Sequence, residues 1–212
     1  MPETAHLAMP TDLLLGKHPI ISDQISRPAL GVVLGELEYV LSQGVAGDIA
    51  EFGCYIGTTS LFIRRLLDEQ GSDKLFYAYD SFAGLPEKTA ADGSVAGDQF
   101  KAGELGVSKK QFLQEFHKAG LAPPIAHKAW FRDLTELQLP DKLAFAFLDG
   151  DFYESIIDSL RLTWPRLTPG GTIVIDDYDR EALPGVSRAV RDFFQGKAMR
   201  LHHEHNIGII RT

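Results

Sequence analysis

Residues 144–179, AFAFLDGDFYESIIDSLRLTWPRLTPGGTIVIDDYD, determine the fold that this chain can adopt. Two short apolar runs, LAFAFL and TIVI, each end in aspartates, and the segment between them carries apolar residues at helical spacing before a Pro-Gly-Gly breaker. This order predicts a strand, a crossover helix and a second strand. Because such crossovers are right-handed and join parallel strands, both acidic ends should meet at one edge of the sheet, where open α/β sheets bind ligands.

Composition and charge point to a small-molecule partner. With 212 residues the chain suits one domain, or one domain with a small appendage. Its formal net charge of −8 argues against binding to nucleic acid or to an anionic membrane, because both are bound through clustered lysines and arginines. One cysteine excludes a disulfide within the chain, and the first residues lack the pattern of a signal peptide. We therefore expect a cytoplasmic protein.

Strands and helices are expected to alternate along most of the chain. Residues 1–44 are predicted to form an N-terminal unit, an irregular arm followed by a helix, and residues 45–212 the main domain. A glycine-rich loop at 86–107 is expected to be a lid or a binding loop. Outside the opening stretch we predict strands at 47–53, 75–79 and 125–128, helices at 28–44, 58–67, 109–120 and 184–194, and a hairpin at 199–212.

A glycine turn, EFGCYIG at 51–57, lies where a doubly wound fold places its nucleotide-binding turn. Its spacing is G-x-x-x-G, and Glu51 would repel a pyrophosphate but attract a ligand that carries a sulfonium and an ammonium group. Asp80 ends the next predicted strand, where a carboxylate can accept both hydroxyls of a ribose. The combination predicts a site for S-adenosylmethionine, with an ordinary strand-to-helix turn as the alternative.

The aspartates at the ends of the two opening strands are candidate metal ligands. Asp149, Asp176 and Asp177 offer only hard oxygen donors, which suit Mg²⁺ or Ca²⁺ better than zinc. A hydroxyl bound to such a cation would have a lowered pKa and a fixed orientation. The alternative is that strand ends carry aspartates as turn formers, and Asp151 is expected to cap the helix that begins near Tyr153.

Two further groups of side chains have two interpretations each. Trp130 and Phe131 follow a short predicted strand and either face an adenine ring or belong to the core. His202, His203 and His205 form a dense cluster, but they alternate on a late and exposed hairpin. A metal-binding role for the three histidines is therefore the weaker interpretation.

Five segments of the chain together resemble the macrocin-type O-methyltransferases, a family of small class I S-adenosylmethionine-dependent enzymes that methylate sugar hydroxyls of antibiotics. They are GDIAEFGCYIG (47–57), YDSFAGLPE (79–87), AWFRDL (129–134), FLDGDFYESIIDSL (147–160) and LTPGGTIVIDDYD (167–179). The resemblance implies an α/β fold of the class I methyltransferase (Rossmann-like) type. Its doubly wound, mostly parallel sheet would have seven strands and a C-terminal antiparallel hairpin.

The resemblance also implies roles for individual residues. Asp149, Asp176 and Asp177 would bind Mg²⁺, and Asp149 would also act as general base, with Asp151 as the alternative base. S-adenosylmethionine would contact a set of residues that lie after the predicted strands: Glu51, Gly53, Tyr55, Gly57, Thr58, Asp80, Ser81, Trp130, Phe131 and Asp149. Residues 1–44 would cover the acceptor as a lid or pocket wall, or would mediate contact between subunits.

The predicted function is metal-dependent methyl transfer to a hydroxyl of a small molecule, namely a sugar of a natural product. A catechol-like diol as acceptor and a non-catalytic S-adenosylmethionine-binding protein are the alternatives. A nucleic-acid methyltransferase is disfavoured, because the second acidic strand end is Asp-Asp-Tyr and not an N-P-P-Y-like sequence. A dehydrogenase is disfavoured by the spacing of the glycines. The partners expected are a hydroxylated small molecule and a second copy of the chain, with no nucleic acid and no membrane.

Overall fold

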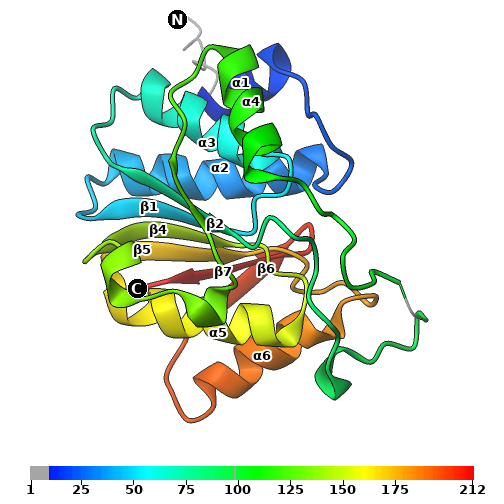
Figure 1. Cartoon of the computed structure of the whole chain (residues 1–212). Coiled ribbons are helices and arrows are strands. Elements are labelled where there is room, and N and C mark those ends of the chain that lie inside the picture. Colours follow the sequence, from blue (N-terminus) through cyan, green and yellow to red (C-terminus); the bar gives the residue numbers. More distant parts are fainter. Residues whose placement is uncertain (1–9, 98) are drawn as a thin grey trace, which may run out of the picture.

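The computed structural model describes residues 10–97 and 99–212, which form three layers with one sheet in the middle (Figure 1). Helices α1 to α4 lie on one side of the sheet and α5 and α6 on the other (Figure 1). The helices are α1 (Pro10–Lys17), α2 (Arg27–Ser42), α3 (Thr58–Glu69), α4 (Lys109–Ala119), α5 (Tyr153–Thr163) and α6 (Pro184–Phe194). The strands are β1 (Asp48–Phe52), β2 (Phe76–Asp80), β3 (Ile125–Lys128), β4 (Leu143–Leu148), β5 (Leu167–Ile175), β6 (Leu201–Glu204) and β7 (Ile207–Arg211). Four short 3₁₀ turns are η1 (Ala90–Asp92), η2 (Phe131–Asp133), η3 (Glu136–Gln138) and η4 (Trp164–Arg166).

The seven strands pair in the order β3-β2-β1-β4-β5-β7-β6. The first five in this order are parallel, and β7 runs antiparallel to both β5 and β6. Every residue of β4 is buried, as its apolar sequence LAFAFL requires for a strand covered on both faces. The predicted fold, a doubly wound and mostly parallel seven-stranded sheet with an antiparallel hairpin, is therefore confirmed.

The sheet reverses its winding between β1 and β4. From β1 the chain moves outward through β2 to β3, then returns to place β4 on the other side of β1. In such sheets the carboxyl ends of the two strands at the reversal frame a crevice, because their connections leave in opposite directions. The ends of β1 and β4, at Phe52 and Leu148, therefore mark where a ligand should bind.

Two local predictions were wrong. Residues 10–17 form α1, although the sequence indicated an irregular arm over this part of the chain; residues 1–9 of that arm lie outside the described residues. Strand β5 begins at Leu167, so it includes the Pro-Gly-Gly sequence that we expected to precede it. A bulge accommodates this sequence, because Leu143 pairs with Leu167 while Phe145 already pairs with Thr172.

The N-terminal helix α2 shares a hydrophobic core with the sheet. Its side chains Leu34 and Leu37 have no exposed surface and belong to one apolar cluster with Phe145 of β4 and Val174 of β5. Helix α2 is also linked to β7, because Arg211 donates two hydrogen bonds, of 2.8 and 2.5 Å, to the buried carboxylate of Glu36 in α2. Among the described residues, no helix has the length and apolar character needed to cross a membrane.

Because α2 completes this core, we expect Leu34→Ala to destabilise the whole protein by about 2–5 kcal/mol, the usual cost of a leucine-sized cavity. Urea unfolding followed by fluorescence of Trp130 and Trp164, which both lie outside α2, should show one transition shifted to lower urea. Leu13→Ala in α1 is the control, because Leu13 is 58% exposed. An unchanged tryptophan transition in Leu34→Ala would instead mean that α2 unfolds as a separate unit.

Candidate active site

The turn that follows β1 is pressed against the end of β4. Gly53 has φ +92°, and a Cβ atom at this position would lie 1.7 Å from the backbone oxygen of Asp149. Only glycine fits both the left-handed conformation and the close approach. The Asp149 N–H donates to the Phe52 oxygen at 2.8 Å, so β1 and β4 stay paired up to this contact. The glycine turn and the first acidic strand end therefore form one rigid edge.

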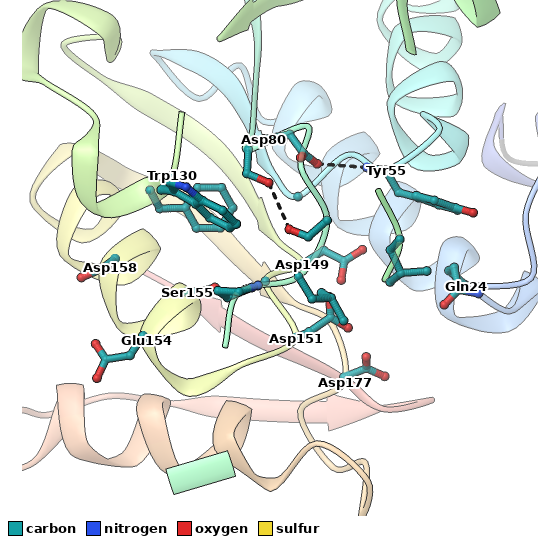
Figure 2. A pocket seen from close by; sticks show the side chains of 18 of the residues that line it. Gln24, Tyr55, Asp80, Trp130, Asp149, Asp151, Glu154, Ser155, Asp158 and Asp177 are labelled. Carbon is teal, nitrogen blue, oxygen red and sulfur yellow. Dashed lines mark hydrogen bonds between the residues drawn. The ribbon is translucent and has the colours of Figure 1, made fainter. Parts of the chain in front are cut away.

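Asp80, at the end of β2, organises the glycine turn. Its Oδ2 accepts the N–H groups of Tyr55 at 3.1 Å (Figure 2) and of Cys54 at 2.7 Å, and its Oδ1 accepts the Phe82 N–H at 2.7 Å. Burial raises the pKa of Asp80, although these three donors act in the opposite direction. The carboxylate predicted to accept ribose hydroxyls thus already takes three backbone hydrogen bonds, which tie the turn to the loop after β2.

Glu51 lies beneath the pocket. Its side chain is 1% exposed, and its Oε2 accepts a short hydrogen bond from the Ser60 hydroxyl of α3. Burial raises the pKa of Glu51 from its usual 4.5 to about 8, while the hydrogen bond from Ser60 opposes the shift. Glu51 is not among the residues that line the pocket. The hydrogen bond that the structure gives to its carboxylate is thus to α3 and does not come from the pocket wall.

A pocket opens at the carboxyl ends of β1, β2, β4 and β5 (Figure 2). Of the predicted cofactor residues, those that line it are Gly53, Tyr55, Asp80, Ser81, Trp130, Phe131 and Asp149. Gly57 and Thr58 are buried behind the turn, and the Thr58 hydroxyl is hydrogen-bonded to Ser22 at 2.8 Å. Phe131 lines the pocket and also packs edge-on against Phe52, with ring centroids 5.4 Å apart. Phe131 therefore borders the pocket and also packs against the core, while its predicted contact with an adenine ring stays a prediction.

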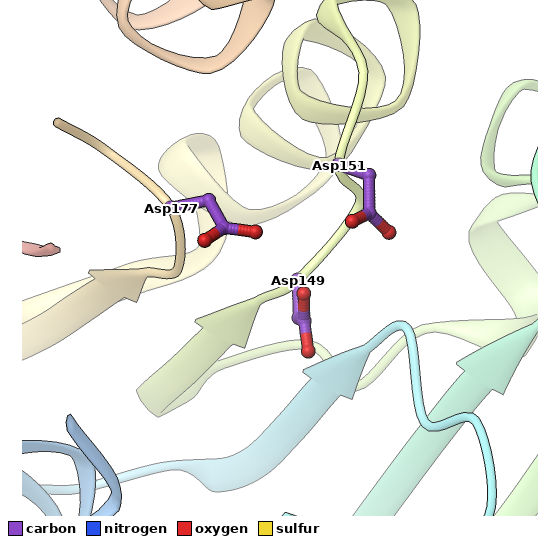
Figure 3. A group of neighbouring side chains, drawn as sticks. All are labelled: Asp149, Asp151 and Asp177. Atoms are coloured by element: carbon purple, nitrogen blue, oxygen red, sulfur yellow. The ribbon is translucent and has the colours of Figure 1, made fainter. Parts of the chain in front are cut away.

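Three carboxylates meet at one side of this pocket. Ligand oxygens of Asp149, Asp151 and Asp177 all lie within 4.8 Å of one another (Figure 3). Asp151 has φ +59° and Asp177 has φ +53°, a left-handed conformation that aspartate tolerates better than most residues. Arg180 donates to Asp177 at 3.0 Å, and among the described residues it is the one cationic side chain that forms an ion pair with the three carboxylates. We call Asp149, Asp151 and Asp177 the carboxylate cluster.

The carboxylate cluster holds its protons more tightly than isolated aspartates do. Burial, followed by the negative charges of neighbouring aspartates, raises the pKa of Asp149 well above its usual range. Burial and Asp177 raise the pKa of Asp151 to about 7, and Arg180 opposes this shift. Burial also raises the pKa of Asp177, against the effect of Arg180. A cation at this position would relieve the repulsion, because it favours the ionised carboxylates.

The structure groups these acids differently from the sequence prediction. The prediction placed Asp176 with Asp149 and Asp177, whereas the structure brings Asp151 to that position. Asp176 is buried beside the cluster, and its Oδ1 accepts the Asp177 N–H at 2.8 Å. The expected capping role of Asp151 was wrong, because the first N–H of α5, that of Tyr153, is donated at 2.7 Å to Asp92.

Of the pocket residues that the sequence analysis did not predict, two lie outside both the quoted motifs and the expected binding loop. Gln24 reaches the pocket from the segment between α1 and α2, and Arg180 reaches it from the segment after β5. Neither lies in a recognisable motif, so no sequence signal identified them. The three histidines are exposed on the hairpin, where the Nδ1 atom of His203 is 3.9 Å from the Asp179 carboxylate.

The strand order and the residues at the carboxyl edge of the sheet together define a class of protein. A 3-2-1-4-5-7-6 sheet, with the glycine turn and the acidic strand ends on either side of its reversal, is the class I methyltransferase fold. The chain belongs to the macrocin-O-methyltransferase (TylF) family, whose sequence profile matches residues 26–205.

Relatives and a solved structure agree with this assignment. The 8-demethyl-8-(2,3-dimethoxy-alpha-L-rhamnosyl)-tetracenomycin-C 4'-O-methyltransferase of Streptomyces olivaceus is 35% identical over 164 residues, which are 74% of this chain and 61% of that protein. Mycinamicin III 3''-O-methyltransferase of Micromonospora griseorubida is 31% identical over 165 residues, covering 74% and 64%. The O-methyltransferase NovP superposes with a TM-score of 0.76 at 25% identity, covering 88% of this chain and 80% of NovP. The chain therefore spans about three fifths of the length of the two curated relatives.

The buried Glu51 should make stability depend on pH. Because its pKa is raised in the folded protein, the folded state keeps a proton that the unfolded chain releases, and stability falls as pH rises from about 4.5 to about 8. Glu51→Gln should reduce this slope, which for one such group reaches about 1.4 kcal/mol per pH unit. Urea midpoints between pH 5 and 9 measure it.

Ser60→Ala is the matched variant for this experiment. Removing the Ser60 hydroxyl removes the contact that lowers the pKa of Glu51, so the loss of stability should extend to higher pH. If Glu51→Gln keeps the wild-type slope, Glu51 does not hold a proton in the folded protein.

Proposed function

We propose that this chain is a metal-dependent O-methyltransferase that moves a methyl group from S-adenosylmethionine to a sugar hydroxyl of a natural product. The observation that carries the proposal is the contact of Gly53 with the backbone of Asp149, which joins the glycine turn to the carboxylate cluster. The names of the two relatives described above support it, because each is an O-methyltransferase, and the tetracenomycin enzyme's name includes a rhamnosyl group.

The cofactor would lie along the glycine turn. S-adenosylmethionine, when bound, supplies a methyl group on a positively charged sulfur. Around the pocket, Tyr55 and Gly53 border the turn, Ser81 follows β2, and Trp130 and Phe131 offer aromatic faces. In this proposal Asp80 holds the turn in shape by accepting its backbone N–H groups. Glu51 contributes through the hydrogen bond that it accepts from Ser60 of α3. The aromatic pair suits an adenine ring, since flat apolar surfaces stack well on it.

A divalent cation fits the carboxylate cluster. Oxygen donors that lie within 4.8 Å of one another, without cysteine or histidine, match the ligands that Mg²⁺ prefers. Asp149 and Asp177 are in both the predicted set and the observed cluster, and the third ligand is either Asp176, as the resemblance implies, or Asp151, as the geometry favours. Bound Mg²⁺ would supply charge that lowers the pKa of a neighbouring hydroxyl.

The proton of the acceptor hydroxyl needs a base at the same place. Asp149 is the proposed general base, since it lies at the contact between the turn and the cluster. Asp151 is the second candidate, because its pKa of about 7 suits proton transfer near neutral pH. The chain's remaining contribution is orientation, which brings the reacting groups together and excludes other geometries.

The acceptor would enter beside the carboxylate cluster. The residues that line the pocket include Gln24, from the proposed acceptor-facing unit at residues 1–44, and Leu85, Leu105 and Arg180. These side chains combine an apolar surface with hydrogen-bonding groups, which suits a glycoside whose sugar carries several hydroxyls. A catechol-like diol is the second acceptor class, because it presents two adjacent oxygens to a cation.

Release of S-adenosylhomocysteine tests the function. With S-adenosylmethionine and Mg²⁺, we expect release in the presence of glycosylated natural products and weaker or no release with catechols. Asp149→Asn should lower turnover by about a hundredfold or more, as loss of a general base does, while calorimetry shows nearly unchanged binding of S-adenosylhomocysteine. His203→Ala, on the exposed hairpin, should keep wild-type turnover. Cofactor binding without release for any hydroxylated acceptor would favour a non-catalytic protein.

Titration with Mn²⁺, a spectroscopic substitute for Mg²⁺, tests the cation site. Asp149→Asn and Asp177→Asn should weaken Mn²⁺ binding at least about tenfold, since each removes a charged ligand. Asp158→Asn is the control, because Asp158 lines the pocket outside the carboxylate cluster. The third ligand is whichever of Asp151→Asn and Asp176→Asn causes the same loss. Full turnover in the presence of a chelator would contradict the metal requirement.

A further inference from the structure

Asp92 is a buried carboxylate far from the carboxylate cluster in sequence but connected to it in space. It lies in η1, within the long loop between β2 and α4, and it is 3% exposed. Its Oδ2 accepts the N–H and the hydroxyl of Thr89, at 2.8 and 2.9 Å. Its Oδ1 accepts the Tyr153 N–H of α5 at 2.7 Å. One carboxylate therefore closes the loop's own turn and caps a helix 61 residues later in the chain.

Helix α5 depends on this contact at its start. The residue before the helix, Phe152, provides no side-chain cap, and the carboxylate of Asp92 caps the helix instead. A negative charge at the N-terminus of a helix is favourable, because the unpaired N–H groups carry partial positive charge. Asp151 lies only two residues before Tyr153 and has φ +59°. The position of α5 therefore affects where the Asp151 carboxylate points.

Helix α6 is shaped to admit Asp92. A Cβ atom on Gly185 would lie 2.0 Å from the Asp92 Oδ1 atom and 2.9 Å from the Tyr153 nitrogen. Three further hydrogen bonds hold the same part of the loop. Arg188 donates to the backbone oxygens of Ala91 and Gly93, the second at 3.3 Å. The Ser94 hydroxyl donates to the Glu181 oxygen at 2.6 Å. The loop is thus docked on α5 and α6 by specific contacts.

The other end of the same loop forms a wall of the pocket. Gly84, Leu85, Pro86 and Leu105 line it. Backbone hydrogen bonds close the loop at this end, from the Leu85 N–H to the Glu104 oxygen at 2.8 Å and from the Gly103 N–H to the Leu85 oxygen at 2.9 Å. The loop therefore has one end at the pocket and, through Asp92, a hydrogen bond to the start of α5.

We propose that Asp92 is a positioning residue. It fixes the position of the pocket wall, which the loop forms, relative to the turn at Asp149–Asp151. This loop wall is the acceptor side only if the proposed function is correct, but the mechanical coupling between the loop and α5 does not depend on it. Without the Asp92 carboxylate, the loop loses its hydrogen bond to α5, and the first turn of α5 loses its cap.

Hydrogen exchange measured by mass spectrometry tests the coupling without any acceptor. In Asp92→Ala we expect exchange to speed up at least about fivefold, the ratio that corresponds to loss of a helix cap, both at residues 84–97 and at residues 149–158. Protection of β4 should stay at the wild-type level, which shows that the fold is intact. Faster exchange in the loop alone, with an unchanged start of α5, would overturn the proposal.

Three variants keep the test decisive even if Asp92→Ala folds poorly. Gly185→Ala should reproduce the faster exchange in both segments, because the added Cβ displaces the Asp92 carboxylate from the other side. Asp92→Asn should show a smaller effect, since its oxygen still accepts from Tyr153 while its amide cannot accept from Thr89. Gly93→Ala is the control, because its Cβ would meet only the Ala90 oxygen, at 3.5 Å. Wild-type exchange in Gly185→Ala would contradict the proposal.

Ligand measurements on the same variants separate this proposal from the proposed function. If both hold, Asp92→Ala should raise the KM for a glycosylated acceptor about fivefold or more and weaken Mn²⁺ binding, with unchanged affinity for S-adenosylhomocysteine. A purely structural role would lower the melting temperature and leave the KM of the folded fraction unchanged, which would overturn the positioning role. If no acceptor is methylated by the wild type, the proposed function fails, while hydrogen exchange still decides the role of Asp92.

Discussion

The geometry of the pocket at the carboxyl edge of the sheet depends on how closely β1 and β4 approach each other where they end. Gly53 has no room for even one side-chain carbon, because the backbone oxygen of Asp149 occupies that space. Backbone pairing continues into this contact on both sides of β1, from Gly53 to Tyr79 and from Asp149 to Phe52. The turn that would hold a methyl donor and the acid that would face an acceptor are therefore fixed to each other by main-chain geometry, which moves less than side chains do.

The carboxylate cluster is a costly arrangement for a folded protein without ligands. Three carboxylates lie close together and at least partly buried, two of the residues adopt a left-handed backbone conformation, and Arg180 offsets part of the repulsion. Such features lower stability and persist only where the surrounding structure is stable enough to maintain them. Here the support comes from the two apolar clusters on either face of the sheet, in which β4 and β5 take part.

Much of the fold was predictable because it follows from local patterns. Apolar runs such as LAFAFL, helical spacing, and the capping box at Ser108 that starts α4 each specify one element. Helix α1 and the start of β5 were missed, since a short helix and a strand containing Pro169 are stabilised by neighbours that the sequence does not reveal. The same holds for the site. The predicted ends of the strands indicated where the acidic residues come together. The direction of each carboxylate could not be predicted, because it depends on backbone conformations such as the left-handed ones of Asp151 and Asp177. The hydrogen bond from α5 to Asp92 could not be predicted either, because it joins segments that share no motif.

The antiparallel hairpin has a consequence for how the chain reaches its native state. Strand β7 lies between β5 and β6, and its Arg211 is bonded to Glu36 of α2, 175 residues earlier in the chain. Contacts between such distant segments require a large loop to close before they become favourable, which slows folding. During synthesis, α2 and the edge of β5 therefore lack these partners until β7 has emerged. Over that interval the unpaired edge of β5 and the apolar surface of α2 that contacts β7 are available to chaperones or to other chains.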